Sequence, residues 1–173
     1  MSLCMPDAAE ERITDITPEQ LRSMGIKALI LDADNTLSGH GSQVPFEGVL
    51  EWVARMREEG FSAVIVSNNF KKRVKPFAET FGLPYISMAL KPFPLGYLRA
   101  VRLMNVSRKE TAAIGDQIFT DILGARWTGV RSILVTPQGE ESVLRFGWRR
   151  RLEAPIRKKI QEQKDGKCDK KGD

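Results

Sequence analysis

Short apolar runs alternate with segments of helical periodicity along this chain, and this alternation constrains its fold more than any other feature. Each apolar run is only a few residues long and ends near a glycine or a polar residue, as expected of strands buried on both faces of a parallel sheet. The pattern predicts strands over residues 27–34, 61–67, 84–87, 111–116 and 131–136, and helices over residues 14–24, 46–59, 70–81, 94–104 and 117–126. Five strands interleaved with helices indicate the α/β class, with a doubly wound parallel sheet that binds ligands beyond the carboxyl ends of its strands.

The composition is that of a soluble globular domain. The chain has 173 residues, of which 42% are hydrophobic and 28% charged, and this suits one folded domain. Its two cysteines, Cys4 and Cys168, form neither a disulfide framework nor a metal-binding spacing, which favours a reducing cytoplasm. The first residues do not resemble a secretory signal peptide, and no apolar run approaches the roughly 18 residues of a membrane span. We therefore expect a cytoplasmic protein without a transmembrane segment.

The basic character of the chain is concentrated near its C-terminus. From Arg145 to Asp173 there are 11 Lys and Arg and 5 Asp and Glu, a net charge of +6 within a total of +5. An apolar residue recurs at every fourth position, at Leu144, Trp148, Leu152, Ile156 and Ile160. Such a basic amphipathic helix suits an anionic membrane surface or, less well, RNA. Alternatively, the apolar stripe packs on the domain or on a second subunit. Pro155 is expected to interrupt this segment.

These shifts in composition divide the chain into four parts. Residues 1–25 form an N-terminal segment with a capped helix, in which Thr17, Pro18 and Gln20 fit an N-cap, a first-turn proline and a capping box. The core domain follows, and then the basic amphipathic segment and a polar tail that is expected to be disordered. Their bounds are 26–140, 141–162 and 163–173.

Chemically active side chains lie just beyond the predicted strands. Because the carboxyl ends of parallel strands meet at one edge of the sheet, we expect these side chains to gather there. They are Asp32, Asp34 and Thr36 after the first strand, Ser67, Asn68 and Asn69 after the second, Lys91 before helix 94–104, and Asp116 and Asp121 after the fourth. Crowded carboxylates are costly unless a cation neutralises them, and oxygen ligands suit a hard ion such as Mg²⁺. The sequence therefore predicts a site for Mg²⁺ and a phosphate group, where one aspartate attacks phosphorus and another donates a proton to the leaving oxygen.

In this order along the chain, the motif DxDxT at Asp32, an apolar strand ending at Ser67, Lys91, and the motif GDxxxxD at Asp116 resemble the haloacid-dehalogenase superfamily of phosphotransferases. The resemblance covers residues 26–137. The stretches VIVSNNFKKRV and IGDQIFTDILGARWTG are similar to the capless subfamily IIIA, and in particular to its YqeG-type branch, which is similar to phosphatidylglycerophosphate phosphatases. The resemblance implies a Rossmann-like parallel sheet without a cap domain. It also implies a Mg²⁺-dependent phosphatase that forms an aspartyl-phosphate intermediate.

The resemblance implies a role for each residue that matches a motif. Asp32 would be the nucleophile and a metal ligand, and Asp34 the general acid and base, with its main-chain carbonyl on the metal. Lys91 would stabilise the charge of the phosphoryl group. Asp116 would be a metal ligand, and Asp121 would orient Lys91 or a metal-bound water. The substrate-binding residues would be Thr36, Ser67, Asn68 and Lys91.

A site without a cap has no lid of its own, so the substrate must itself exclude water. A lipid phosphate at an anionic membrane surface would do so, and phosphatidylglycerophosphate is the most specific expectation, with peripheral attachment to the inner face of the membrane. A phosphoprotein, a nucleic-acid end or a sugar phosphate remains an alternative substrate. From a different class, the chain could be an RNA- or ribosome-associated binding protein with weak catalysis.

Several nearby side chains are expected to be solvated. Lys71, Lys72, Arg73 and Lys75 are typical of an exposed helix face, and a loop histidine such as His40 is more often solvated than bound to substrate. Because every candidate site residue precedes Pro137, we expect a chain cut there to retain hydrolysis of a small soluble ester.

Overall fold

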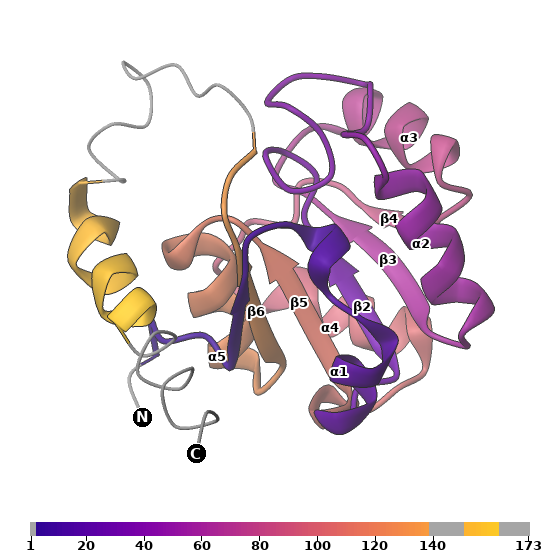
Figure 1. Cartoon of the computed structure of the whole chain (residues 1–173). Helices are drawn as coiled ribbons and strands as arrows, with labels where there is room; N and C mark the ends of the chain where they lie inside the picture. The colour runs from indigo at the N-terminus through magenta and orange to yellow at the C-terminus, as the bar shows by residue number, and fades with distance from the viewer. Residues whose placement is uncertain (1–2, 139–150, 163–173) are drawn as a thin grey trace.

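The computed structural model describes residues 3–138 and 151–162 and contains one parallel sheet covered by helices (Figure 1). The sheet has six strands in the order β1-β6-β5-β2-β3-β4, and every neighbouring pair is parallel. The strands are β1 Ala8–Glu10, β2 Ala28–Leu31, β3 Ser62–Val66, β4 Tyr85–Ile86, β5 Thr111–Gly115 and β6 Arg131–Val135. The helices are α1 Pro18–Ser23, α2 Val49–Glu58, α3 Lys71–Thr80, α4 Pro94–Met104 and α5 Leu123–Thr128, with short turns of other helix types at η1 Ile13–Asp15, η2 Arg108–Glu110 and η3 Ile118–Ile122. The doubly wound fold is confirmed, and no insertion within residues 3–138 forms a cap domain.

The prediction of five strands was wrong by one. The sixth strand, β1, pairs with β6 at the edge of the sheet. Its sequence, Ala-Ala-Glu, is too short and too weakly apolar to show a strand period. The strand is held in place by Asp7, whose carboxylate accepts hydrogen bonds from the main-chain N–H of Ser132 at 2.9 Å and from Arg126 Nη1 at 2.8 Å. The hydrogen bonds of Asp7 therefore fix β1, a strand that the local sequence pattern does not predict.

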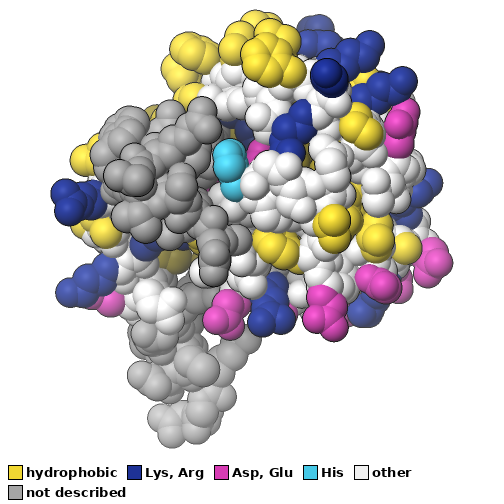
Figure 2. Space-filling view, turned by 90° about the horizontal axis from the view of Figure 1, so that it is seen from above, with side chains coloured by type: hydrophobic (Ala, Val, Ile, Leu, Met, Phe, Trp, Pro, Cys, Tyr) yellow, Lys and Arg dark blue, Asp and Glu magenta, His cyan; other side chains and the backbone are white. Residues whose placement is uncertain are grey.

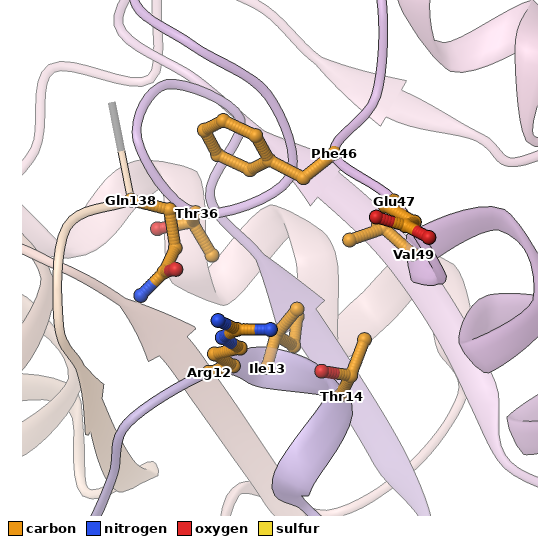
Figure 3. Close-up of a pocket in the computed structure, with 8 residues that line it drawn as sticks. All are labelled: Arg12, Ile13, Thr14, Thr36, Phe46, Glu47, Val49 and Gln138. Carbon is orange, nitrogen blue, oxygen red and sulfur yellow. The ribbon is translucent and has the colours of Figure 1, made fainter. Parts of the chain in front are cut away.

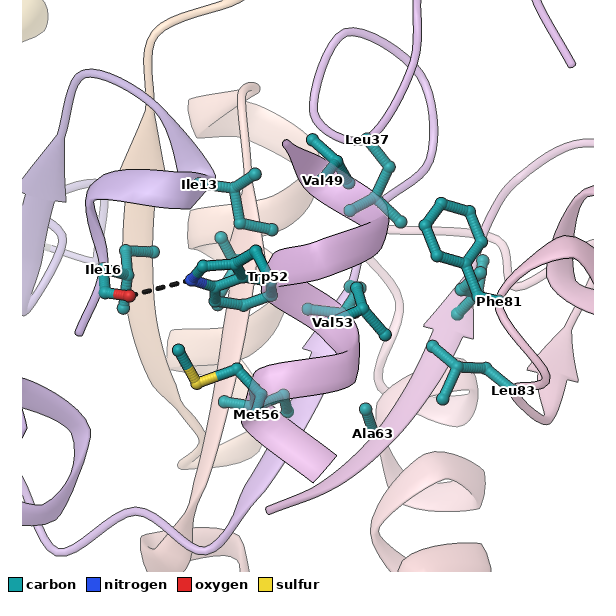
Figure 4. Packing of buried hydrophobic residues seen from close by; sticks show 14 of the residues in the cluster. Ile13, Ile16, Leu37, Val49, Trp52, Val53, Met56, Ala63, Phe81 and Leu83 are labelled. Atoms are coloured by element: carbon teal, nitrogen blue, oxygen red, sulfur yellow. Dashed lines mark hydrogen bonds between the residues drawn. The ribbon is translucent and has the colours of Figure 1, made fainter. Parts of the chain in front are cut away.

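Two hydrophobic clusters fill the two sides of the sheet, because each strand is buried on both faces. On one side α1, α2 and α3 pack on Leu29, Leu31 and Ile65, and on the other α4 and α5 pack on Ile30 and Val64. In the first cluster Trp52 of α2 is buried, and its Nε1–H donates a hydrogen bond to the main-chain oxygen of Ile16 at 2.8 Å (Figure 4). This bond satisfies the one polar group of a large core side chain and ties α2 to the N-terminal segment.

Two predicted helices differ from those observed. The helix expected over residues 14–24 is split into η1 and α1, although its N-cap is confirmed: the Thr17 hydroxyl accepts a hydrogen bond from the N–H of Gln20 at 3.2 Å. The helix expected over residues 117–126 begins as a π-helical turn, η3, before α5. Wider turns of this type occur often at functional sites, where they redirect a side chain.

The described part of the C-terminal segment packs against the domain. Residues 151–162 are helical, and Ile156 and Ile160 join a third cluster with Ile118, Ile122 and Leu134. The packing alternative is therefore confirmed for these two residues, whereas Leu152 is 55% exposed. The predicted interruption at Pro155 is wrong: residues 151–162 form one helix, and Pro155 lies on its exposed side.

The expected tail over residues 163–173 and the basic residues Arg149 and Arg150 lie outside the described residues. In the part of the chain that the structure describes, no helix has the length and apolar character needed to cross a bilayer.

Candidate active site

A pocket of about 160 Å³ opens where the carboxyl ends of β2, β3 and β5 meet. Figure 2 looks onto this face, on which the single histidine lies near groups of hydrophobic and of Lys and Arg side chains. The residues that line the pocket are Asp32, Asp34, His40, Ser67, Asn68, Asn69, Lys91, Gln117, Thr120 and Asp121. The structure therefore brings most of the predicted site residues to one place.

A buried lysine joins two carboxylates at the bottom of this pocket. Lys91 Nζ donates hydrogen bonds to Asp32 Oδ1 and, at 2.7 Å, to Asp121 Oδ1. Burial raises the pKa of Asp32 to about 7, against the opposing effect of Lys91. Burial alone would lower the pKa of Lys91, but the carboxylates of Asp121 and Asp32 outweigh it and hold this pKa well above its usual value. The lysine is therefore a fixed positive charge, while Asp32 sits where its own charge is poorly compensated.

Three buried carboxylates could hold a metal ion. One oxygen from each of Asp32, Asp116 and Asp121 lies within 4.8 Å of the other two. This all-oxygen donor set fits a hard divalent cation, and the charge of the ion would offset the crowding of the carboxylates. The carboxylate of Asp34 is not part of this group.

Asp34 is held by loops on the more open side of the pocket. Its carboxylate accepts hydrogen bonds from Asn69 Nδ2 and from Arg73 Nη2, both at 2.5 Å, and from the N–H of Gly41 at 3.0 Å. The expectation that Arg73 is solvated was therefore wrong, because this ion pair leaves only 25% of its side chain exposed. His40 Nδ1 lies 3.7 Å from Asp34 Oδ1, at the mouth of the pocket. The helical pattern of 70–81 showed a charged face but not which of its cations turns toward the site.

The loop after β3 orients Lys91 as well as lining the pocket. Asn68 Oδ1 accepts the main-chain N–H of Lys91 at 2.7 Å, and its Nδ2 donates to the main-chain oxygen of Lys91 at 3.1 Å. Ser67 Oγ lies in the pocket and accepts the N–H of Asn69 at 3.2 Å. Asn68 thus acts as a two-point clamp on the segment that carries the lysine.

Thr36 is not brought to this pocket. The backbone of Asn35 is left-handed, with φ 59°, and turns the chain so that Thr36 lines a second pocket of about 180 Å³ together with Arg12, Phe46 and Gln138 (Figure 3). The sequence pattern placed Thr36 at the right loop but could not give the direction of its side chain.

The position of the Asp121 carboxylate depends on two residues, which the sequence analysis did not assign to the site. A Cβ atom added to Gly115 would lie 2.4 Å from Asp121 Cγ, so only glycine allows the carboxylate to fold back over the end of β5. The buried Tyr97 donates its hydroxyl to the main-chain oxygen of Thr120 at 3.0 Å and so holds η3 from the side of α4. The carboxylate is thereby aimed at Lys91.

This fold and site define a hydrolase in which carboxylates and a lysine converge at the strand ends of a parallel sheet. The family model of the haloacid dehalogenase-like hydrolases matches residues 38–129. "Probable phosphatase YqeG" of Bacillus subtilis is 41% identical over 133 residues, which are 77% of this chain and 77% of that protein. The chain belongs to the haloacid dehalogenase-like hydrolases, and it is a phosphatase.

One more distant relative agrees with this assignment, and one solved structure shares the fold. "Pyrophosphatase PpaX" of Halalkalibacterium halodurans is 31% identical over 113 residues, which are 59% of this chain and 52% of that protein. The cobalt-bound deoxy-D-mannose-octulosonate 8-phosphate phosphatase YrbI of Haemophilus influenzae is similar in structure, with a TM-score of 0.54 and 13% identity over 65% of this chain and 69% of that chain. At this identity the structural similarity shows the fold alone.

Proposed function

We propose that the protein hydrolyses a phosphomonoester with Mg²⁺, through an aspartyl-phosphate intermediate on Asp32. The observation that carries the proposal is the buried contact of Lys91 with both Asp32 and Asp121 at the bottom of a pocket. Burial raises the pKa of Asp32, which makes its carboxylate a stronger nucleophile once it is ionised, and the lysine can stabilise the negative charge of the phosphoryl group in the transition state.

The proposed reaction has two steps. A carboxylate oxygen of Asp32 forms a bond to phosphorus, the ester P–O bond breaks, and Asp34 donates a proton to the leaving alcohol oxygen. Asp34 then takes a proton from a water molecule, whose oxygen forms a bond to the phosphorus of the aspartyl-phosphate. The bond between phosphorus and the Asp32 oxygen breaks, which releases inorganic phosphate and restores the Asp32 carboxylate. Both aspartates line the pocket, and Ser67 and Asn68 lie beside them to bind phosphoryl oxygens.

Mg²⁺ would be held by Asp32, Asp116 and the main-chain carbonyl of Asp34, with Asp121 as a supporting carboxylate. The bound ion would supply positive charge that keeps Asp32 ionised and orients the phosphate. Lys91, already bound to Asp121, then faces the substrate rather than the solvent.

The test of this chemistry is the Asp32→Asn variant. Its amide has nearly the same shape but cannot attack phosphorus, so turnover of a soluble phosphate ester should be lost. Asp116→Ala should raise the Mg²⁺ concentration needed for activity, and EDTA should silence the wild type reversibly. Clear Mg²⁺-dependent turnover by purified Asp32→Asn would overturn the proposal.

We further propose that the substrate is a lipid phosphate, with phosphatidylglycerophosphate as its most specific form. Four large apolar side chains, here called the apolar rim, follow or flank the pocket residues: Phe70, Met88, Leu90 and Phe93 are 72%, 55%, 60% and 58% exposed. Met88 and Leu90 have left-handed backbones, with φ 48° and 55°. Large residues seldom adopt this conformation, and its cost is often met at binding sites. In this segment Lys91 is buried, whereas Met88 and Leu90 on either side of Ala89 are exposed.

Cations at the start of α3 support an anionic surface as the place of action. Lys71, Lys72 and Arg73 occupy the first turn, where the helix dipole disfavours positive charge by about 0.3–1 kcal/mol each. Lys71 and Lys72 are exposed beside Phe70. A rim that enters the lipid interface, next to cations that bind anionic head groups, would place the pocket at the bilayer of the inner membrane face.

Vesicle flotation tests this substrate. We expect the wild type to bind phosphatidylglycerol-containing vesicles, and the Phe70→Gln/Phe93→Gln variant to lose binding and lipid-phosphate turnover. Leu103→Gln is the matched control, since Leu103 is 55% exposed near the C-terminal end of α4, where the chain returns to the amino end of β5. Equal binding by wild type and rim variant would exclude the apolar rim as a membrane surface.

A further inference from the structure

The helix at residues 151–162 places a buried carboxylate against the loop that carries Asp116. Glu153 is only 4% exposed. Its Oε1 accepts the main-chain N–H of Ile118 at 2.9 Å and of Phe119 at 3.4 Å. These are the first N–H groups of η3, which have no partner within the helix itself. A residue from the far end of the chain therefore caps the turn between Asp116 and Asp121.

An arginine on the same helix reaches the neighbouring peptide. Arg157 Nη2 donates a hydrogen bond to the main-chain oxygen of Asp116 and a second one, at 2.9 Å, to Glu153 Oε2. Its Nε lies 3.2 Å from the same Glu153 oxygen. Glu153 and Arg157 thus form one unit that holds the backbone on both sides of Gln117, by an oxygen on one side and a guanidinium on the other.

We propose that Glu153 and Arg157 are positioning residues that fix Asp116 for Mg²⁺. The proposal rests on the metal role proposed above for Asp116. Side chains that orient the ligands of a metal typically change its affinity about 10- to 100-fold when they are removed. It follows that the catalytic site is not complete at the end of β6, and that residues beyond position 150 belong to it.

The polar pair is not needed for packing alone. Ile156 and Ile160 already attach the helix to Ile118, Ile122 and Leu134. A buried glutamate is costly in an apolar contact unless it is hydrogen bonded and paired with a positive charge. Here the N–H groups after Asp116 supply the hydrogen bonds and Arg157 supplies the positive charge. These contacts offset the cost of burying the Glu153 carboxylate.

The proposal adds a condition to an expectation from the sequence that stays a prediction. A chain cut after Pro137 was expected to retain hydrolysis of a small ester, because all motif residues precede the cut. The cut removes both Glu153 and Arg157, so the shortened chain should bind Mg²⁺ more weakly.

Isothermal titration of the full-length chain with Mg²⁺ tests the proposal without relying on activity. We expect Glu153→Ala and Arg157→Gln to weaken Mg²⁺ binding about tenfold. Glu153→Gln, which keeps an acceptor oxygen for the N–H of Ile118, should restore part of the affinity. Glu162→Ala and Lys158→Gln are matched controls, because they remove the same charges from exposed positions of the same helix; both should bind within twofold of the wild type.

The outcomes separate this proposal from the one on which it rests. If Asp116→Ala weakens Mg²⁺ binding but Glu153→Ala and Arg157→Gln do not, the positioning role is wrong and the metal site stands. If Asp116→Ala itself binds Mg²⁺ like the wild type, the proposed metal site is wrong. Should Arg157→Gln fail to fold, Arg157→Lys retains the charge and one donor, and its Mg²⁺ affinity should lie between those of the wild type and Glu153→Ala; wild-type affinity in both Arg157→Lys and Glu153→Ala would overturn the proposal.

Discussion

Asp32 and Asp7 are both aspartates beside positive side chains, yet the protein shifts their pKa values in opposite directions. Burial raises the pKa of Asp32 to about 7, and Lys91 offsets this only in part. Burial also acts to raise the pKa of Asp7, but hydrogen bonds from Ser132 and the guanidinium of Arg126 outweigh it and lower the pKa. The charge of Asp32 at the pocket is only partly compensated, whereas the charge of Asp7 beside β1 is compensated by its hydrogen-bond donors.

The difference separates the carboxylate proposed as the nucleophile from one that stabilises a strand. Asp7 accepts four hydrogen bonds, from Arg126, from Arg131 and from both the N–H and the hydroxyl of Ser132, and so stabilises the pairing of β1 with β6. The network of Asp32 leaves carboxylates crowded at a place where a cation and a phosphate can bind. Charges that are poorly compensated without a ligand are a usual property of active sites. The predictions below test this contrast.

The largest expected effect follows from removing the cation that contacts Asp32 and Asp121. Lys91→Met should lower turnover about 10²–10³-fold, because a fixed positive charge at the phosphoryl group is lost. It should also destabilise the metal-free protein by about 3–5 kcal/mol, since Asp32 and Asp121 would face each other without a partner. Turnover assays and urea unfolding check both effects, with Lys109→Met as an exposed control away from the pocket. Turnover within tenfold of the wild type would contradict the role of Lys91.

A smaller effect is expected from displacing one member of that network. In Gly115→Ala the new methyl group would overlap Asp121 Cγ at 2.4 Å, so the carboxylate must move away from Lys91. We expect a loss of turnover of about 10- to 100-fold, as is typical when a catalytic group is misplaced by about 1 Å. Gly39→Ala is the control, because its nearest atom would be Ser42 Cβ at 3.8 Å. If both variants are equally active, the close approach over β5 is not needed.

The sequence predicted the grouping of the pocket residues better than the network around Asp7. Asp32, Ser67, Lys91 and Asp121 each follow or precede an apolar strand, and parallel strands must bring such residues to one edge. The buried strands and the helices of the core were visible for the same reason, since their periods reflect which faces are covered. The order of the motifs added the roles that the resemblance implies.

Contacts between distant segments could not be predicted in this way. β1 lacks a strand pattern, and it is placed by Asp7, about 125 positions from Ser132. Arg73 and Lys72 are adjacent cations in the sequence, and only the turn of α3 decides that Arg73 reaches Asp34. Glu153 and Arg157 had the appearance of ordinary charges in a basic helix. In each case the partner is set by tertiary packing, which leaves no local signal.

The two aspartates should respond to the same substitution with opposite changes in stability. In the metal-free protein at about pH 8, Asp32→Asn should raise the free energy of unfolding by about 1–2 kcal/mol, because a poorly compensated buried charge is removed. Asp7→Asn should lower it by about 1–3 kcal/mol, because charged hydrogen bonds are lost, while turnover at low temperature stays unchanged. Urea unfolding in EDTA measures both values. A decrease for both variants would mean that Asp32 is as well satisfied as Asp7.

The smallest expected effect is a change with pH in the stability difference between the wild type and each of the two Asn variants. The pKa of Asp7 is lower in the folded chain than the value of about 3.9 expected when unfolded, so its stabilisation is present above about pH 4 and is lost as the pH falls through the folded pKa. The pKa of Asp32 is raised to about 7, so its penalty develops as the pH rises from about 4 to about 7 and is constant above that. In metal-free protein, the gap between wild type and Asp7→Asn should therefore narrow below about pH 4, whereas the gain from Asp32→Asn should grow between about pH 4 and pH 7. Unfolding curves measured across this range check both windows, and two profiles that change together over the same pH range would show that the two carboxylates are not in opposite electrostatic environments.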